Sequence, residues 1–366
     1  MFTNLRAFFA PTTRTAARRN RTTLRLETLE RRETPAAFTV NTLVDSVDAS
    51  PGDGIARDAN GLTSLRAAIE ESNALGGAHT IGFTPQVVGV IDLTLGSSLD
   101  LDADITIHGF GQGVSRPGGL GFFRIMSVAQ GRTCEIQFLT LTNGNSAFSA
   151  GGIDNSGNLT LYHVGIKNNQ TAVDGGAIRN RNGGIIWMQS CEIRDNSALG
   201  NGGGIRNDGD LFVGDSTIMS NRAVNGNGGG IFNTQGANVI IADPALLAGP
   251  SQISGNSASG LVGAGGGVWN AGAFTMNFGG LSGNGAGAGG GGIYSMDGTA
   301  TLNSVGLVGN GATTGGGFYL ASGSLTTNQC GFVMNFATTG NGGAYKVGST
   351  YTDNGSTFFM NWVTMI

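Results

Sequence analysis

The chain has 366 residues, of which 24 are acidic and 20 are basic, giving a formal net charge of −4. Glycine is abundant, with 66 residues, but proline is scarce and no Gly-X-Y period is present, which excludes collagen-like and Pro/Gly-rich disordered classes. Residues 38–366 hold 12 basic and 21 acidic side chains. An acidic body repels phosphate backbones, so no nucleic-acid partner is expected. No run approaches the roughly 18 apolar residues of a membrane-spanning helix.

Residues 1–37 carry eight arginines and are expected to be an export leader that is disordered or removed. The apolar stretch at 5–10 is shorter than the core of a secretory signal peptide, which has at least about 7 residues. Residues 26–36, Leu-Glu-Thr-Leu-Glu-Arg-Arg-Glu-Thr-Pro-Ala, resemble the L-E-x-L-E-x-R-x-x-P-A export motif of large bacterial surface proteins. The resemblance implies an extracellular, outer-membrane-associated protein. The alternative is a short amphipathic helix of the mature chain.

Residues 38–130 are expected to form an N-terminal cap and the first coils of a stack. The segment 64–74 predicts a helix with Thr63 or Ser64 as N-cap and with Leu65, Ala68 and Ile69 on one face. It is similar to the S-L-R-x-A-I-x-x-x-N element of many β-helix surface proteins, which implies that the helix closes the end of the stack. Alternating apolar residues predict strands at 37–42, 80–83, 87–95, 105–108, 122–127 and 135–141.

Residues 131–366 contain a repeat of about 25 residues with two markers in phase. The first marker is the apolar residue after paired glycines, at Ile153, Ile178, Ile205, Ile231, Val268, Ile293, Phe318 and Tyr345. The second is apolar-x-x-Asn, with Asn169, Asn196, Asn221, Asn256, Asn284, Asn310 and Asn335.

Because the glycines would break any helix, each unit is expected to be one coil of three short strands. The prediction is an all-β, single-domain, right-handed parallel β-helix of about ten coils. One unit is longer than the others, and residues 242–250 are expected to be its inserted loop.

The G-G-A/G-I and apolar-x-x-Asn markers resemble the repeats of polymorphic outer-membrane proteins and, more broadly, the pectin-lyase-like superfamily. The resemblance covers roughly residues 130–350. It implies the β-helix fold but leaves function open, because the superfamily includes lyases, hydrolases, adhesins and passenger domains.

The residue after the first marker should point outward, and in four successive coils it is aromatic: Phe232, Trp269, Tyr294 and Tyr319. Aromatic faces about 5 Å apart can stack on sugar rings, so this stripe is the candidate binding site of an exported surface protein with a binding or adhesive role. The expected partner is a surface glycan or another cell-surface component, and the oligomeric state is left open. Alternatively, the aromatic residues only stabilise the sheet or lie under the inserted loop.

The competing hypothesis is a polysaccharide lyase or glycoside hydrolase. Its best catalytic candidates are Lys167 and Arg194, in the same slot of adjacent coils, with Asp195 beside them. Asp174, Asp208, Asp210 and Asp215 lie nearby in the sequence, but charges on a wet face usually only solvate it. No motif implies a metal or another cofactor, and the repeated asparagines, including Asn155, Asn180, Asn207, Asn233 and Asn270, are interpreted as structural ladders at the turns.

Cys134, Cys191 and Cys330 are assigned to one inward-facing slot of different coils. Their spacing along the stack exceeds the roughly 7 Å that a disulfide allows between Cα atoms. Three buried free thiols are expected.

Overall fold

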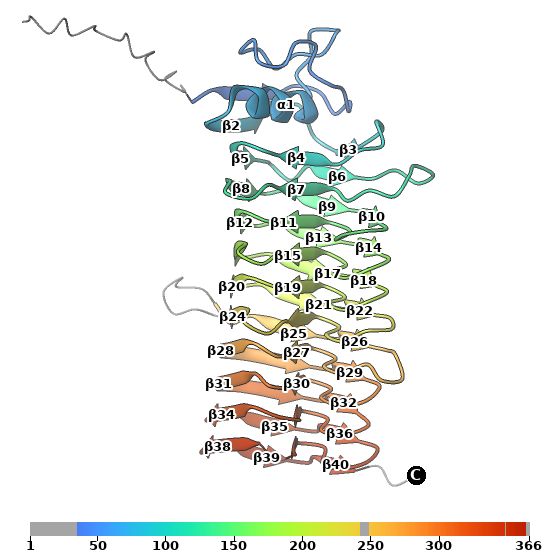
Figure 1. Cartoon of the computed structure of the whole chain (residues 1–366), viewed down its shortest axis with the longest axis vertical. Helices are drawn as coiled ribbons and strands as arrows, with labels where there is room; N and C mark the ends of the chain where they lie inside the picture. The colour runs from blue at the N-terminus through green and yellow to red at the C-terminus, as the bar shows by residue number, and fades with distance from the viewer. Residues whose placement is uncertain (1–34, 242–248, 348, 364–366) are drawn as a thin grey trace, which may run out of the picture. The chain divides into compact units, whose positions relative to one another are not determined.

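From Ala37 onward the chain winds as a right-handed parallel β-helix in which each coil pairs with the coils before and after it (Figure 1). The computed structural model describes residues 35–241, 249–347 and 349–363. These residues belong to one compact unit. The export motif, apart from its last two residues, and most of the predicted leader lie outside the described residues.

The described strands form three parallel sheets, here called A, B and C. Sheet A takes two strands from most coils, separated by a bend. It consists of β1 (Ala37–Val40), β2 (Ala78–Phe83), β3 (Val90–Asp92), β5 (Asp104–His108), β6 (Gly113–Ser115), β8 (Thr133–Gln137), β9 (Thr140–Thr142), β12 (Asn158–Tyr162), β13 (Gly165–Lys167), β16 (Ile185–Gln189), β17 (Glu192–Arg194), β20 (Asp210–Gly214), β21 (Thr217–Met219), β24 (Asn238–Ile241), β25 (Gln252–Ser254), β28 (Ala273–Ser282), β31 (Thr299–Val308), β34 (Ser324–Asn328), β35 (Gly331–Val333), β38 (Thr350–Asn354) and β39 (Thr357–Phe359).

Sheets B and C take at most one strand from a coil, and sheet C begins later in the chain, at β10. Sheet B consists of β4 (Leu99–Leu101), β7 (Met126–Val128), β11 (Ile153–Asn155), β15 (Ile178–Asn180), β19 (Ile205–Asn207), β23 (Ile231–Asn233), β27 (Val268–Asn270), β30 (Ile293–Ser295), β33 (Phe318–Leu320) and β37 (Ala344–Lys346). Sheet C consists of β10 (Asn145–Ser146), β14 (Gln170–Thr171), β18 (Ser197–Ala198), β22 (Arg222–Ala223), β26 (Ser257–Ala258), β29 (Gly285–Ala286), β32 (Gly311–Ala312), β36 (Phe336–Ala337) and β40 (Trp362–Val363).

The bends between strands use residues in the left-handed region of backbone space. In the coil that starts at β12, His163 (φ 51°) bends sheet A, Asn168 (φ 56°) leads into sheet C, and Gly175 (φ 75°) leads into sheet B. The third bend needs glycine for a second reason. A Cβ on Gly175 would lie 2.4 Å from the carbonyl oxygen of Ile178, closer than real contacts allow. The glycine pairs that gave the sequence its repeat therefore mark the entry to sheet B.

The interior is a continuous column of aliphatic side chains. In sheet B the first marker stacks in register from Ile153 through Ile178, Ile205 and later coils to Phe318, and each of these side chains is fully buried. Parallel strands repeat every ~4.8 Å, so each buried side chain packs on its counterparts above and below.

Two ladders of asparagine side chains run inside the bends, as the sequence predicted. In one ladder, the Nδ2 atoms of Asn155, Asn180, Asn207 and Asn233 donate to the Oδ1 atom of the next member at 2.8–2.9 Å, ending on Asn270. In the other, Asn169, Asn196, Asn221, Asn256, Asn284, Asn310 and Asn335 do the same at 2.9–3.1 Å, ending on Asn361. These buried amides also bond the backbone, so they tie the bends of neighbouring coils together.

Helix α1 (Leu65–Leu75) covers the N-terminal edge of sheet B, and Ser64 is its N-cap, accepting a hydrogen bond from the Ala67 amide at 2.9 Å. Asn73 donates to the Asp100 carbonyl at 2.7 Å and accepts from the Asp102 amide at 2.9 Å. Its side chain thus substitutes for the missing neighbour of strand β4. Within the described residues, no helix is long and apolar enough to cross a membrane.

Arg66, the arginine of the S-L-R-x-A-I-x-x-x-N element, also has a structural role. Arg66 is buried and pairs with Asp45 at 2.6 Å. It also donates to the carbonyls of Ser97 and Ser98 at 3.0 Å each. The motif therefore encodes a helix that is both packed and hydrogen-bonded onto the first complete coil.

Three sequence predictions about strand boundaries need correction. The strand predicted at 87–95 is only β3, because Gly89 has a φ of 135°. The segment 122–127 contributes only the start of β7. The segment 135–141 is divided into β8 and β9 at Phe138, whose φ is 51°.

Two register assignments were also wrong. Phe318 pairs with Ala344, so Tyr345 and not Lys346 lies opposite Tyr319. Cys134 lies in the first strand of its coil, opposite Leu159, and not in the slot of Cys191 and Cys330.

The inserted loop predicted at 242–250 falls mostly outside the described residues. Its two flanks are β24 and β25, which both belong to sheet A.

All three thiols are free and buried, as predicted. Burial raises the pKa of Cys134 and of Cys191 to about 11, against an ordinary value of 9.0. Burial also raises the pKa of Cys330. A buried protonated thiol behaves as a small hydrophobe, and only its thiolate reacts readily.

The buried asparagine ladder that contains Asn256 should contribute more to stability than an asparagine ladder on the surface. Asn256→Ala removes the partners of the Ile218 carbonyl (2.8 Å) and the Asn221 amide (2.9 Å), both buried, so a loss of about 3 kcal/mol in the free energy of unfolding is expected in urea titrations. Asn303→Ala is the matched control. Asn303 belongs to a half-buried ladder on the outside of sheet A, bonding Asn277 at 2.7 Å and Asn328 at 2.6 Å, and its loss should cost less than about 1 kcal/mol. Equal losses would contradict the role given to the inner ladder.

The thiols should make the fold less stable at high pH. Because the folded pKa values of Cys134 and Cys191 lie above the unfolded value, the unfolded chain loses these protons first. Their contribution is complete below pH ~9 and is lost as the pH rises to about 11. In a Cys134→Ala/Cys191→Ala variant, the decline in unfolding free energy over this range should be smaller than in the wild type. Titration should find three free thiols in the denatured, unreduced chain, and fewer would disprove the assignment.

Candidate functional site

The outer face of sheet B carries the predicted stripe. Each strand of this sheet has three residues, and the middle one points outward. The register aligns these outward residues in the order Asp154, Arg179, Arg206, Phe232, Trp269, Tyr294, Tyr319. The four aromatic residues selected from the sequence are therefore neighbours on one face, and they continue directly from two arginines and a buried aspartate.

The aromatic half consists of stacked pairs. The rings of Phe232 and Trp269 lie 4.3 Å apart at 11°, and those of Tyr294 and Tyr319 lie 5.0 Å apart at 3°. Trp269, Tyr294 and Tyr319 are half-buried, but Phe232 is only 9% exposed, so the expectation that the whole stripe is solvent-accessible is wrong at this position. Phe232 has Trp269 on one side and the Arg206 guanidinium on the other, 5.8 Å from its ring centroid. Phe232 therefore holds Trp269 and Arg206 in place, and neither face of its ring is open to a ligand.

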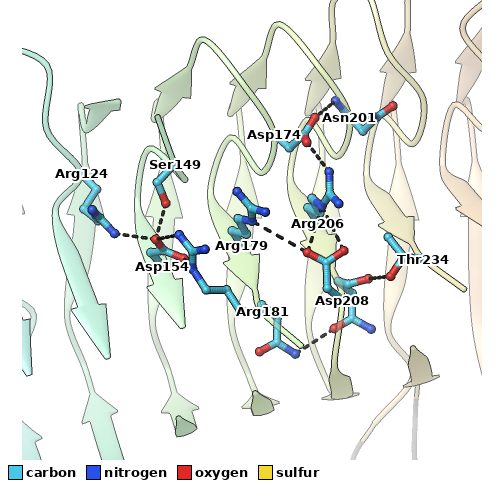
Figure 2. A network of polar contacts seen from close by, with 12 residues as sticks. Arg124, Ser149, Asp154, Asp174, Arg179, Arg181, Asn201, Arg206, Asp208 and Thr234 are labelled. Carbon is cyan, nitrogen blue, oxygen red and sulfur yellow. Dashed lines mark hydrogen bonds and ion pairs between the residues drawn. The ribbon is translucent and has the colours of Figure 1, made fainter. Parts of the chain in front are cut away.

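The polar half is organised around two aspartates, as Figure 2 shows. Asp154 is 3% exposed and accepts hydrogen bonds from Arg124, from Ser149 and, through both carboxylate oxygens, from Arg181 at 2.7 Å. Burial alone would raise the pKa of Asp154, but the bonds from Arg181 and Ser149 outweigh it and hold the pKa below its ordinary value. Asp154 therefore stays ionised and fixes Arg181 at the surface.

The second aspartate, Asp208, lies between two arginines of the stripe. Arg206 Nε donates to Asp208 at 3.0 Å and its Nη1 pairs with Asp174, while Arg179 Nε lies 3.8 Å from Asp208. Among the described side chains, the buried Nε atom of Arg179 has no hydrogen-bond partner. Arg179 therefore lies near Asp208, but its Nε atom makes no hydrogen bond within the described part of the chain.

Two cavities lie along this face and share two residues. One, of about 620 Å³, is lined by Arg179, Arg181, Asp208, Thr234 and Gln235. The other, of about 310 Å³, is lined by Phe232, Thr234, Gln235, Trp269 and Met296, among others. Because Thr234 and Gln235 border both, the two cavities adjoin in one region of the surface, with arginines at one end and Phe232 and Trp269 at the other. We call this region the sheet B groove.

Family models, curated proteins and solved structures were compared with the chain, and none of the three comparisons found a match. The functional interpretation therefore depends on the residues of the site.

The alternative catalytic residues lie on another face. Lys167 and Arg194 are in register on β13 and β17 of sheet A, as the sequence predicted. Arg194 pairs with Asp195 and, at 3.1 Å, with Glu192, and the bond to Asp195 is the main cause that raises the pKa of this guanidinium.

The nearby aspartates do not join this group. Asp174 and Asp208 bind Arg206 beside sheet B, and Asp215 accepts a hydrogen bond from Ser190 at 2.9 Å. Asp210 begins strand β20. In the parts of the chain that the structure describes, no three His, Cys, Asp or Glu side chains gather closely enough to hold a metal ion.

Sequence reasoning missed Arg181, Thr234 and Arg124 as parts of this site, and it grouped Asp208 with the alternative catalytic residues. Arg181, Asp208 and Thr234 follow the ladder asparagines, in turns whose lengths differ from coil to coil. Arg124 lies before the regular repeat and reaches Asp154 across 30 positions. The arginines at 179, 181 and 206 were the available sign of a cationic site in the sequence. That they lie around Asp154 and Asp208 depends on how the strands of neighbouring coils are paired.

Proposed function

We propose that this protein is a binding module displayed on the bacterial cell surface, and that its sheet B groove holds an extended acidic glycan. The observation that carries the proposal is that a cavity lined by arginines adjoins a cavity lined by aromatic residues. Arg179 and Arg181 line one end, the buried Phe232 and the half-buried Trp269 line the other, and Thr234 and Gln235 border both. The groove follows the coil axis, along which outward residues repeat every ~4.8 Å.

The chemistry of the two ends fits a carboxylated sugar chain. A guanidinium donates paired hydrogen bonds to a carboxylate, and Arg179 and Arg181 line the larger cavity with side chains that are 24% and 42% exposed. Trp269 is half-buried and lines the smaller cavity, and Tyr294 follows it in the stripe, so partly exposed aromatic surface is present for stacking on the apolar faces of pyranose rings. Asp154 and Asp208 keep the arginines in place, so little side-chain entropy is lost on binding.

The surface location is proposed from the leader and from the repeats. Residues 26–36 resemble a bacterial export motif, and the glycine and asparagine markers resemble those of polymorphic outer-membrane proteins and of the pectin-lyase-like superfamily. The described coils supply the fold that this resemblance implies. A role in adhesion follows if the bound glycan belongs to a neighbouring cell or matrix.

We favour binding over the lyase or hydrolase alternative because of where the charges lie. A lyase needs a base beside the groups that neutralise the sugar carboxylate. Lys167 and Arg194 are on sheet A, whereas Asp174 and Asp208 pair with an arginine of sheet B.

The test measures binding of the full chain to polygalacturonate and alginate, together with ultraviolet detection of unsaturated products. Wild-type protein should bind without releasing products, and binding should weaken as salt screens the arginines. Trp269→Ala/Tyr294→Ala and Arg179→Gln should each weaken binding at least about tenfold with the β-sheet circular dichroism unchanged.

Lys167→Ala/Arg194→Ala is the matched control on the other face and should bind like the wild type. Undiminished binding by the sheet B variants would overturn the proposal. Unsaturated products that disappear in the Lys167→Ala/Arg194→Ala variant would establish the lyase alternative.

A further inference from the structure

A second set of aromatic residues lies on the outer face of sheet A, away from the sheet B groove. The register of β8, β12, β16 and β20 aligns Glu135, Thr160, Trp187 and Phe212 in one outward column. In the neighbouring column, Gln137, Tyr162 and Gln189 are aligned. The repeat markers do not select these positions, so the sequence pattern gave no indication of the cluster.

The aromatic stack in this column ends abruptly. Trp187 and Phe212 stack with ring centroids 3.9 Å apart at 11°, so one face of the indole is covered. Its other face looks toward Thr160, whose short side chain does not cover an indole. A cavity of about 420 Å³ lies at this step and is lined by Glu135, Thr160, Tyr162, Trp187 and Gln189. We call it the Trp187 slot.

The walls of the slot are held by other contacts. Tyr162 packs edge-on against His163, with centroids 4.2 Å apart, and His163 stacks on Phe138 at 5.0 Å. In the adjacent coil, Glu135 accepts a hydrogen bond from Gln137, whose Oε1 lies 3.1 Å from Nδ1 of His108. Both the aromatic side wall and the carboxylate are therefore fixed before any ligand arrives.

The size of the slot matches one saccharide ring. Glu135 and Trp187 are two coils apart, or about 10 Å between their backbones. A ring stacked on Trp187 at about 4 Å lies above Thr160 and leaves room for its hydroxyl groups to reach the Glu135 carboxylate. Tyr162 and Gln189 flank the ring with further hydrogen-bonding groups. Stacking on one face and polar contacts around the edge is how proteins hold a pyranose.

We propose that the Trp187 slot binds a single neutral pyranose residue, stacked on the indole and hydrogen-bonded to Glu135. The charge of the slot selects against the glycans assigned to sheet B, because Glu135 is the one ionisable carboxylate among the five residues named and would repel a uronic acid. The two faces of the β-helix thus recognise different sugars. The proposal does not depend on the sheet B groove.

The experiment fills the slot and keeps Trp187, Glu135, Tyr162 and Gln189 in place. Thr160→Phe extends the aromatic stack over the exposed face of Trp187. Thr301→Phe is the matched control, since Thr301 occupies the same outward column several coils away. Wild type and both variants are tested on an array of neutral, amino and uronic-acid oligosaccharides, and affinities for the neutral oligosaccharides retained are measured by calorimetry.

The proposal predicts retention of neutral oligosaccharides by the wild type and by Thr301→Phe, and at least about tenfold weaker binding by Thr160→Phe at unchanged thermal stability. Glu135→Gln, a second variant that preserves shape, should also weaken binding. Trp269→Ala/Tyr294→Ala should not, which separates this site from the sheet B groove. The proposal would be overturned if Thr160→Phe still bound neutral oligosaccharides as the wild type does. It would also be overturned if the wild type retained no neutral oligosaccharide on the array, or retained only amino or uronic-acid sugars.

Discussion

The fold depends on the requirement that each coil repeat the register of the one before it. Backbone hydrogen bonds between parallel strands satisfy the straight segments, but the bends leave polar groups that would be buried without partners. The two inner asparagine ladders provide those partners. Asn196, for example, accepts from the Asn169 amide at 2.9 Å and donates to the Ile166 carbonyl at 2.9 Å. A shift of one residue would break every such bond at once, so the ladders specify the register as well as stabilising it.

With the interior fixed in this way, the outward residues can vary without disturbing the fold. The outward column of sheet B changes from charged to aromatic within a few coils, and the column in sheet A passes from Glu135 through Trp187 to threonines such as Thr301. Both candidate sites occur where such a column changes character. In the sheet B groove the change joins arginines to aromatic rings, and in the Trp187 slot it leaves an aromatic face uncovered.

Much of the architecture could be predicted because its signals are local and repeated. The glycines before Ile178 and Ile205 and the asparagines at 169 and 196 appear at fixed positions in each unit, and their roles follow from backbone sterics and amide hydrogen bonding. The cap was predictable from Ser64 and the apolar face of the helix. The predicted register was wrong at Cys134 and at Tyr345, where the spacing between repeat markers changes. The residues of a single repeat do not determine how its strand is offset against the next one.

The candidate sites were only partly predictable. The aromatic stripe follows from the repeat, but the arginine end depends on side chains from different coils, including Arg124 and Arg181, that meet at Asp154. The burial of Phe232 results from its neighbours and not from its own slot. Trp187 and Tyr162 lie outside both markers, so their neighbourhood becomes evident only when the strands are paired.

The role of the inner ladders can be tested most directly by hydrogen exchange of the asparagine side-chain amides, followed by nuclear magnetic resonance of the native protein. The Nδ2 protons of Asn180, Asn207, Asn221 and Asn256 are buried and bonded along the stack, so they should exchange far more slowly than those of Asn354 on the exposed end of the outer ladder. Exchange of the inner amides as fast as that of Asn354 would show that the ladders do not hold the coils in register.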